Sequence, residues 1–103
     1  MWATEYIKKL QEGETVEFRP RGGSMKPLVN SGDLVVVAPI DEETTLEKGD
    51  IVLCKVKGKQ YLHLISAVQG ERYQISNNRG FVNGWISKNA VFGKLHENKR
   101  KQT

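Results

Sequence analysis

The sequence predicts a small, mainly β domain with one short N-terminal helix. The chain has 103 residues, which is the size of a single domain. From residue 15 onward, β-branched residues recur with a period of two or in short apolar runs, as they do in strands. Glycine, proline and asparagine separate these runs at short intervals, which is typical of antiparallel sheets. We therefore expect a single β domain over residues 1–103 and no second domain.

The N-terminal helix is expected within residues 1–13. Four apolar residues fall on one side at helical spacing: Trp2, Tyr6, Ile7 and Leu10. Gly13 follows them at the position of a C-terminal cap. The stripe predicts a helix packed on its own domain, and docking to a membrane surface or a partner is the alternative.

The β core is expected over residues 15–95. Two continuous apolar runs, at 33–38 and 50–56, predict strands covered on both faces. A hairpin turn is expected at 57–60, because Lys57-Gly58 separates two strand-like runs. The remaining strands are expected at 15–19, 61–68, 72–76, 84–86 and 91–95.

The net charge of +4 and the pI near 9.3 do not by themselves indicate a nucleic-acid partner. Half of the charge lies in residues 96–103, which we expect to form a frayed basic tail. Nucleic-acid binding through Arg19, Arg21, Lys26 and this tail is the least favoured function, because no strand combines aromatic and basic residues for base stacking.

Several classes of protein are disfavoured by composition. The single cysteine, Cys54, cannot form an internal disulfide, and two histidines with one cysteine cannot build a zinc site of Cys and His ligands. We expect no metal and no cofactor, and a buried structural thiol at Cys54. There is neither an apolar run of transmembrane length nor a signal peptide, so we expect a cytoplasmic protein that meets membranes only through a partner.

One segment combines features of a nucleophilic site: Arg21-Gly-Gly-Ser-Met-Lys-Pro27. The glycines allow a sharp turn and close approach to a ligand, and Ser24 follows at its exposed edge. Its hydroxyl could act as a nucleophile, while the loop Gly23, Ser24 and Met25 could hold an oxyanion or substrate through backbone N–H groups. An ordinary surface loop has the same composition, so the segment alone leaves both interpretations open.

The wider pattern resembles the signal peptidase and LexA-like serine peptidases. Their signature reads Gly-x-Ser-Met-x-Pro, followed by two Gly-Asp pairs that each open a strand. Here Ser24-Met25-Lys26-Pro27 is followed by Gly32-Asp33 and, 17 residues later, Gly49-Asp50. The resemblance extends from about residue 15 to residue 95 and implies a small β fold of the LexA and signal-peptidase type.

The resemblance also implies a general base at His63, 39 residues after Ser24. Most bacterial-type members have lysine in this slot, so the chain resembles most closely the Ser–His signal peptidases of the endoplasmic reticulum and archaea. Imidazole can accept a hydroxyl proton near neutral pH. A histidine without a catalytic role on a half-buried strand is the alternative, with the turn lysines Lys55, Lys57 and Lys59 as substitute bases.

The chain departs from the family pattern at the third, acidic member of the triad. Ile75-Ser76 stands where histidine-type enzymes have Gly-Asp, while the following Asn77-Asn78 pair is kept. Ser76 or Asn77 is therefore expected to orient His63 without supplying a charge.

Taken together, the sequence predicts a serine endopeptidase that cleaves an extended peptide or protein substrate, with Ser24 as nucleophile and His63 as base. The resemblance implies that the substrate adds a strand at a sheet edge, with small residues near the scissile bond. The alternative is a catalytically impaired module of the same fold that binds a peptide or protein partner.

Overall fold

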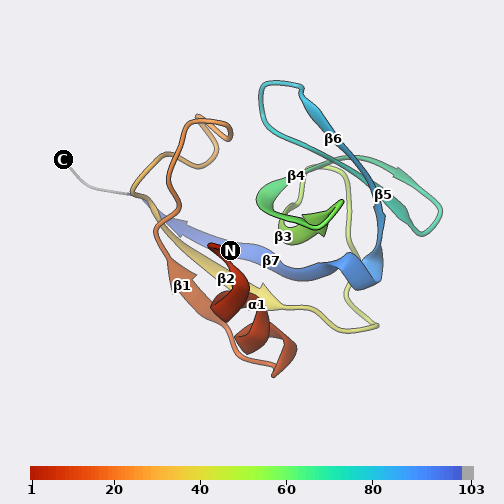
Figure 1. The fold of residues 1–103 in the computed structure, drawn as a ribbon, viewed down its shortest axis with the longest axis horizontal. Helices are drawn as coiled ribbons and strands as arrows, with labels where there is room; N and C mark the ends of the chain where they lie inside the picture. Colours follow the sequence, from red (N-terminus) through yellow and green to blue (C-terminus); the bar gives the residue numbers. More distant parts are fainter. Residues whose placement is uncertain (101–103) are drawn as a thin grey trace.

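The chain folds into one seven-stranded antiparallel sheet with a short helix against it (Figure 1). The computed structural model describes residues 1–100. In chain order the elements are α1 (Thr4–Gln11), β1 (Val16–Phe18), β2 (Leu34–Pro39), β3 (Ile51–Val56), β4 (Lys59–Gln69), β5 (Arg72–Ser76), β6 (Val82–Ser87), the 3-10 helix η1 (Lys88–Ala90) and β7 (Val91–Lys99). The predicted mainly β class is confirmed, and every expected strand has its counterpart.

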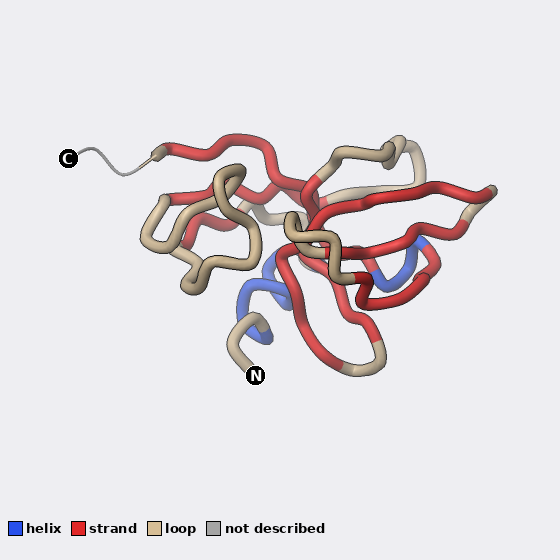
Figure 2. The backbone as a smooth tube through the Cα atoms, turned by 90° about the horizontal axis from the view of Figure 1, so that it is seen from above, coloured by secondary structure: helices blue, strands red, loops and turns tan. Residues whose placement is uncertain are grey.

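The last strand returns to the middle of the sheet. The strand order is β1-β2-β7-β3-β4-β5-β6, so β7 lies between β2 and β3. Strands β3 to β6 form a meander on one side of β7, and β1 and β2 lie on the other (Figure 1). Figure 2 shows how little of the chain is helical beside these strands and their connecting loops. This order brings the β1–β2 connection close to the meander, although the two are distant in the sequence.

The sheet curls around two clusters of buried side chains, and β3 contributes to both. Ile51 and Leu53 belong to the cluster that α1, β1 and β2 cover. Val52 and Cys54 point into the other cluster, with β5 and β6. Successive strand residues face opposite sides of a sheet, so a strand between two cores must be apolar at every position. The prediction that this run is covered on both faces is confirmed for residues 51–54, whereas Lys55 is exposed.

Helix α1 packs on its own domain, as predicted. Ile7 and Leu10 are buried in the first cluster, and Tyr6 stacks on Phe18 with ring centroids 4.4 Å apart. Trp2 precedes the helix and keeps 49% of its surface exposed. Within residues 1–100, no helix is both long and apolar enough to cross a membrane.

The hairpin between β3 and β4 has a tighter turn than the expected four residues. Only Lys57 and Gly58 lie outside the strands, and both have positive φ angles, of 52° and 80°. Two successive positive φ angles match the twist of the flanking strands, which allows pairing to resume at once. As a result β4 begins at Lys59 and is longer than expected.

The expectation of a frayed tail from residue 96 is wrong for residues 96–99, which belong to a strand although most of their side chains are exposed. Strand β7 continues to Lys99, which pairs with Leu34 of β2. The guanidinium of Arg100 then donates to the carbonyl oxygens of Pro27 and Leu28, at 2.9 and 3.1 Å. The backbone of a strand can pair with its neighbour while its charged side chains point into solvent. The charged composition of these residues therefore did not predict a strand. The remainder of the expected tail, residues 101–103, lies outside the described residues.

Candidate functional site: a serine–histidine pair beside an aromatic cavity

The serine loop, residues 19–33, connects β1 to β2 and presents Ser24 at the surface. Met25 and Val29 are buried in the first core cluster and anchor the loop from below. Asn78 anchors it from the side: its backbone N–H donates to the Ser24 carbonyl at 2.9 Å, and its Nδ2 donates to the Lys26 carbonyl at 2.8 Å. The loop that carries Ser24 is therefore fixed by both packing and hydrogen bonds.

The two Gly-Asp pairs fix the turns that open β2 and β3. Oδ2 of Asp33 and Oδ2 of Asp50 each accept a hydrogen bond at 2.8 Å from the backbone N–H three residues earlier. Gly32 and Gly49 have φ angles of +88° and +99°, a conformation that favours glycine. Both aspartates thus belong to the turns that open these strands, and neither contacts His63.

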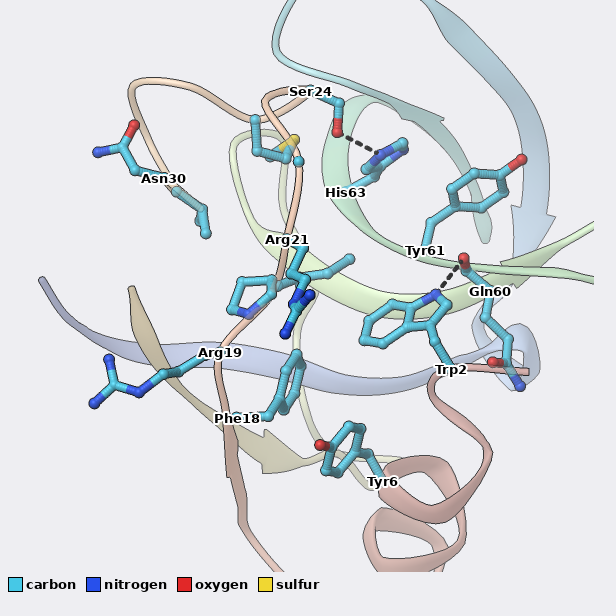
Figure 3. A pocket seen from close by; sticks show the side chains of 15 residues that line it. Trp2, Tyr6, Phe18, Arg19, Arg21, Ser24, Asn30, Gln60, Tyr61 and His63 are labelled. Carbon is cyan, nitrogen blue, oxygen red and sulfur yellow. Dashed lines mark hydrogen bonds between the residues drawn. The ribbon is translucent and has the colours of Figure 1, made fainter. Parts of the chain in front are cut away.

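Ser24 and His63 meet although 39 residues separate them. Ser24 Oγ lies 3.3 Å from Nε2 of His63, as the dashed line in Figure 3 shows. His63 projects from β4, is only 9% exposed, and stacks on Tyr61 with ring centroids 4.7 Å apart. A hydroxyl and an imidazole at this distance have the geometry expected of a nucleophile and its base before substrate binds.

The other ring nitrogen of His63 is held by Asn83, on β6. Nδ1 of His63 lies 2.8 Å from Oδ1 of Asn83. A carbonyl oxygen can only accept, so Nδ1 carries the proton and donates it to Asn83. The neutral ring then has its lone pair on Nε2, facing Ser24. Asn83 thus selects the tautomer in which His63 can accept the hydroxyl proton.

Neither Ser76 nor Asn77 occupies the orienting position that the sequence assigned to them. Ser76 is buried on β5, opposite Leu64, and no hydrogen bond joins it to His63 among the described residues. Oδ1 of Asn77 instead accepts the backbone N–H groups of residues 79 and 81, at 2.9 and 3.0 Å, and shapes the turn between β5 and β6. The residue that contacts His63 lies beyond that turn, on β6.

Asn83 reaches His63 because β6 is bulged. Ser76 of β5 pairs with Val82 and Ile75 pairs with Gly84, so Asn83 is an extra residue opposite that step. A bulge redirects side chains locally, and bulges are common next to active sites. Gly84 has a φ of +149°, which suits glycine. An isolated glycine inside a strand is a bulge signal, and here it could have directed attention to Asn83.

Burial keeps His63 in its neutral form. Loss of solvent lowers the pKa of His63 below its ordinary value near 6.5, and the hydrogen bond to Asn83 only partly opposes this. The lowered pKa leaves the ring uncharged at pH 7. By contrast, Lys55, Lys57 and Lys59 are exposed, and their side chains make no hydrogen bond with any of residues 1–100.

The backbone around Ser24 offers an unused donor. Among residues 1–100, no acceptor receives a hydrogen bond from the Ser24 N–H, whereas its carbonyl is bonded to Asn78. Gly23 and Ser24 lie in a turn with little side-chain cover. A free N–H next to a nucleophile is suited to stabilising an oxyanion that forms beside it.

A cavity of about 370 Å³ begins at the serine–histidine pair and extends toward the N-terminus of α1 (Figure 3). Its far end is aromatic: Trp2 and Phe18 make an edge-on contact with centroids 5.7 Å apart, and Tyr6 stacks on Phe18. Nε1 of Trp2 donates to the Gln60 carbonyl at 3.1 Å, which fixes the ring. Over residues 1–100, no three His, Cys, Asp or Glu side chains converge as a metal site would require.

Fold and site together define a peptidase-fold protein: a curled antiparallel sheet that carries a serine on a glycine-rich loop and a histidine on a neighbouring strand. The comparison with protein families agrees. The family model Peptidase S24-like matches residues 3–95, and the chain belongs to this family. No curated protein matches the chain.

Proposed function

We propose that the protein is a serine endopeptidase of the Ser–His type, with Ser24 as nucleophile and His63 as general base. The observation that carries the proposal is the 3.3 Å contact between Ser24 Oγ and His63 Nε2. The lowered pKa of His63 adds to it, because the ring is neutral and ready to accept a proton at pH 7. Use of histidine makes the chain similar to the histidine-type signal peptidases.

The reaction follows from the arrangement of donors and acceptors. As Ser24 Oγ attacks the carbonyl carbon of the peptide, its proton passes to Nε2 of His63. The carbonyl oxygen becomes an oxyanion beside the free N–H of Ser24. The imidazolium then donates its proton to the leaving amine, which breaks the peptide bond and leaves an ester on Ser24. Water, activated by the same ring, hydrolyses that ester and restores the hydroxyl.

Asn83 orients the base without charging it. Its Oδ1 holds the Nδ1 proton of His63 at 2.8 Å and thereby maintains the reactive tautomer. An amide does not stabilise the imidazolium as a carboxylate would, so we expect slower proton transfer than in a triad with an acid. The reaction needs no metal or cofactor, and its partner is an extended peptide or protein segment.

The proposal is tested by incubating the protein with a library of acetylated, amidated peptides and detecting fragments by mass spectrometry. We expect cleavage by the wild type and a loss of roughly 10³-fold or more for Ser24→Ala and for His63→Ala. Ser31→Ala, an exposed serine of the same loop, and His96→Ala, an exposed histidine of β7, serve as matched controls. Equal cleavage by all five proteins would exclude the mechanism.

A catalytically impaired binding module is the second candidate, and the amide at position 83 is the observation that favours it. Without a negative charge beside His63, the site could retain the fold and the cavity while the chemistry is lost. In that case peptides bind equally well to the wild type and to Ser24→Ala, and neither protein releases fragments.

A further inference from the structure

The cavity beside Ser24 is larger and more aromatic than a small residue at a scissile bond requires. At about 370 Å³ it falls within the 300–1,000 Å³ typical of ligand pockets. Its far wall consists of Trp2, Tyr6 and Phe18 (Figure 3). A polar or small side chain would leave this aromatic surface wet, so the wall favours a large apolar occupant.

The wall is already assembled without a ligand. Trp2 is tied to β4 by its bond to the Gln60 carbonyl, and the side chain of Gln60 holds the first turn of α1 by accepting from the Ala3 N–H at 2.8 Å. Stacking on Tyr6 fixes Phe18 from the other side. Trp2 nevertheless remains 49% exposed, so a ligand can cover its free face. A preformed wall binds with little loss of conformational entropy.

Charge around the cavity has one sign. No aspartate or glutamate lines it, whereas Arg19 and Arg21 do. The guanidinium of Arg19 donates to the Gly32 carbonyl at 2.7 Å, which holds this side chain against the serine loop. Arg21 makes no hydrogen bond or ion pair with any residue between 1 and 100. Figure 3 shows Arg21 between Ser24 and Phe18, so an anion that pairs with it would lie between the serine and the aromatic wall.

Two more cations flank the serine turn. A Cβ on Gly23 would lie 3.6 Å from the Lys26 side chain and 3.8 Å from the Arg79 guanidinium. Neither of these side-chain cations is paired with a carboxylate among the described residues. The approach to Ser24 is thus positive, which favours negatively charged segments during encounter and binding.

We propose that the site selects a peptide segment in which a large apolar or aromatic side chain fills the cavity and a neighbouring aspartate or glutamate pairs with Arg21. This inference rests on the proposed function only in placing the segment across Ser24. It assigns Trp2 and Phe18 as the apolar subsite and Arg21 as the residue that selects for acid.

Binding tests the inference separately from cleavage. Four acetylated, amidated peptides carry phenylalanine or alanine at one position and aspartate or asparagine at the next, so no terminal carboxylate is present. Their affinities are measured by calorimetry on the Ser24→Ala protein, which binds without turnover. Cleavage by the wild type is measured in parallel.

We expect phenylalanine to bind roughly 10- to 100-fold more tightly than alanine because it buries apolar surface. Aspartate should bind up to about fivefold more tightly than asparagine at low salt, and this preference should weaken at high salt. Adding Arg21→Gln should abolish the preference for aspartate and retain the preference for phenylalanine. Lys48→Gln, an exposed cation in the turn before β3, should change neither.

In the binding assay, the inference is overturned if no peptide binds measurably or if aspartate is not preferred over asparagine. It is also overturned if the preference for aspartate is unchanged after Arg21→Gln. Preference for aspartate in binding together with no cleavage by the wild type would reject the endopeptidase and leave the inference standing. Cleavage by the wild type at equal rates for all four peptides would support the endopeptidase and reject the inference.

Discussion

Replacing Asn83 with aspartate tests the electrostatic account of the site. Asn83→Asp keeps the size of the side chain and changes the charge 2.8 Å from Nδ1 of His63. A carboxylate there favours the imidazolium, so the pKa of His63 should rise from its present value, which burial holds below 6.5. The change is local, because Asn83 makes no other hydrogen bond through its side chain among residues 1–100.

The size of the change in the pKa of His63 follows from the distance between the new carboxylate and the imidazole ring. Two unit charges about 4 Å apart interact by about 4 kcal/mol at an effective dielectric constant near 20. Desolvation of the new carboxylate offsets part of this, and contacts of this kind leave roughly 1.4 to 4 kcal/mol in favour of the charged form. At a given pH, the ratio of imidazolium to imidazole should therefore rise by roughly 10- to 1,000-fold.

The direction of the change in the pKa of His63 should be visible in the pH dependence of stability as well as in activity. In the wild type the unfolded chain takes up a proton near pH 6.5, before the folded protein does, so His63 makes the protein less stable as pH falls through 6.5 toward its lowered pKa. In Asn83→Asp the folded state binds that proton at higher pH. The free energy of unfolding of the variant, relative to the wild type, should therefore increase as pH is lowered from 8 to 5.5.

Urea denaturation at several pH values, followed by tryptophan fluorescence, measures this difference. Asn89→Asp, a change of the same charge at an exposed asparagine of η1, is the control and should give a difference that is nearly independent of pH. If the protein is a peptidase, its rate should also rise about tenfold, because the base is stronger and the imidazolium is stabilised. A stability difference that is flat, or that decreases toward pH 5.5, would refute the reasoning.

Three further changes probe the frame around the site. In Gly93→Ala the new Cβ would lie 2.6 Å from Cγ1 of Val37, so urea denaturation should show a loss of about 1–3 kcal/mol. Cys54 is fully buried and its pKa is raised to about 12, so Ellman's reagent at pH 8 should react roughly 10³-fold more slowly than with the unfolded chain. Asn98→Ala removes a donor 3.1 Å from the Leu28 carbonyl and should destabilise the protein by about 1–3 kcal/mol.

Matched variants serve as controls for the changes at Gly93 and Asn98. Gly23→Ala should leave stability nearly unchanged, because only flexible side-chain ends lie within 4 Å of the added carbon. Rapid reaction of Cys54 under native conditions would show that the second core cluster opens readily. For Asn98, the matched change is Asn89→Ala at the surface; equal stability of both variants would mean that β7 does not hold the serine loop.

The predicted elements that succeeded were those with a local cause. Residues 51–54 of β3 alternate between two cores and are all apolar, and the sequence shows this run directly. The Gly-Asp pairs form turns whose hydrogen bonds span three residues, so the sequence contains the whole unit. Residues 96–99 were missed because their place in the sheet depends on β2, which lies about 60 residues earlier.

The residues of the candidate site also fall into those that could be predicted from the sequence and those that could not. Order and spacing of the motifs led to Ser24 and His63, and the fold brings these two side chains within 3.3 Å. Asn83 could not be assigned from sequence, because a one-residue bulge decides which side chain of β6 faces His63. The aromatic cavity was also missed, since Trp2 and Tyr6 carry the pattern of an ordinary core helix.

By itself, therefore, the sequence determined the strand-rich class and the strand-opening turns, because hydrophobic periodicity and turn chemistry act over a few residues. The two residues of the proposed chemistry came from the resemblance of its motifs to the signal peptidase and LexA-like peptidases. Tertiary structure alone decided what surrounds those two residues: the amide of Asn83 at Nδ1 of His63, the lowered pKa of that ring, the hydrogen bonds from Arg100 to the serine loop, and the aromatic wall. These depend on strand register and burial, which arise only when distant segments pack together.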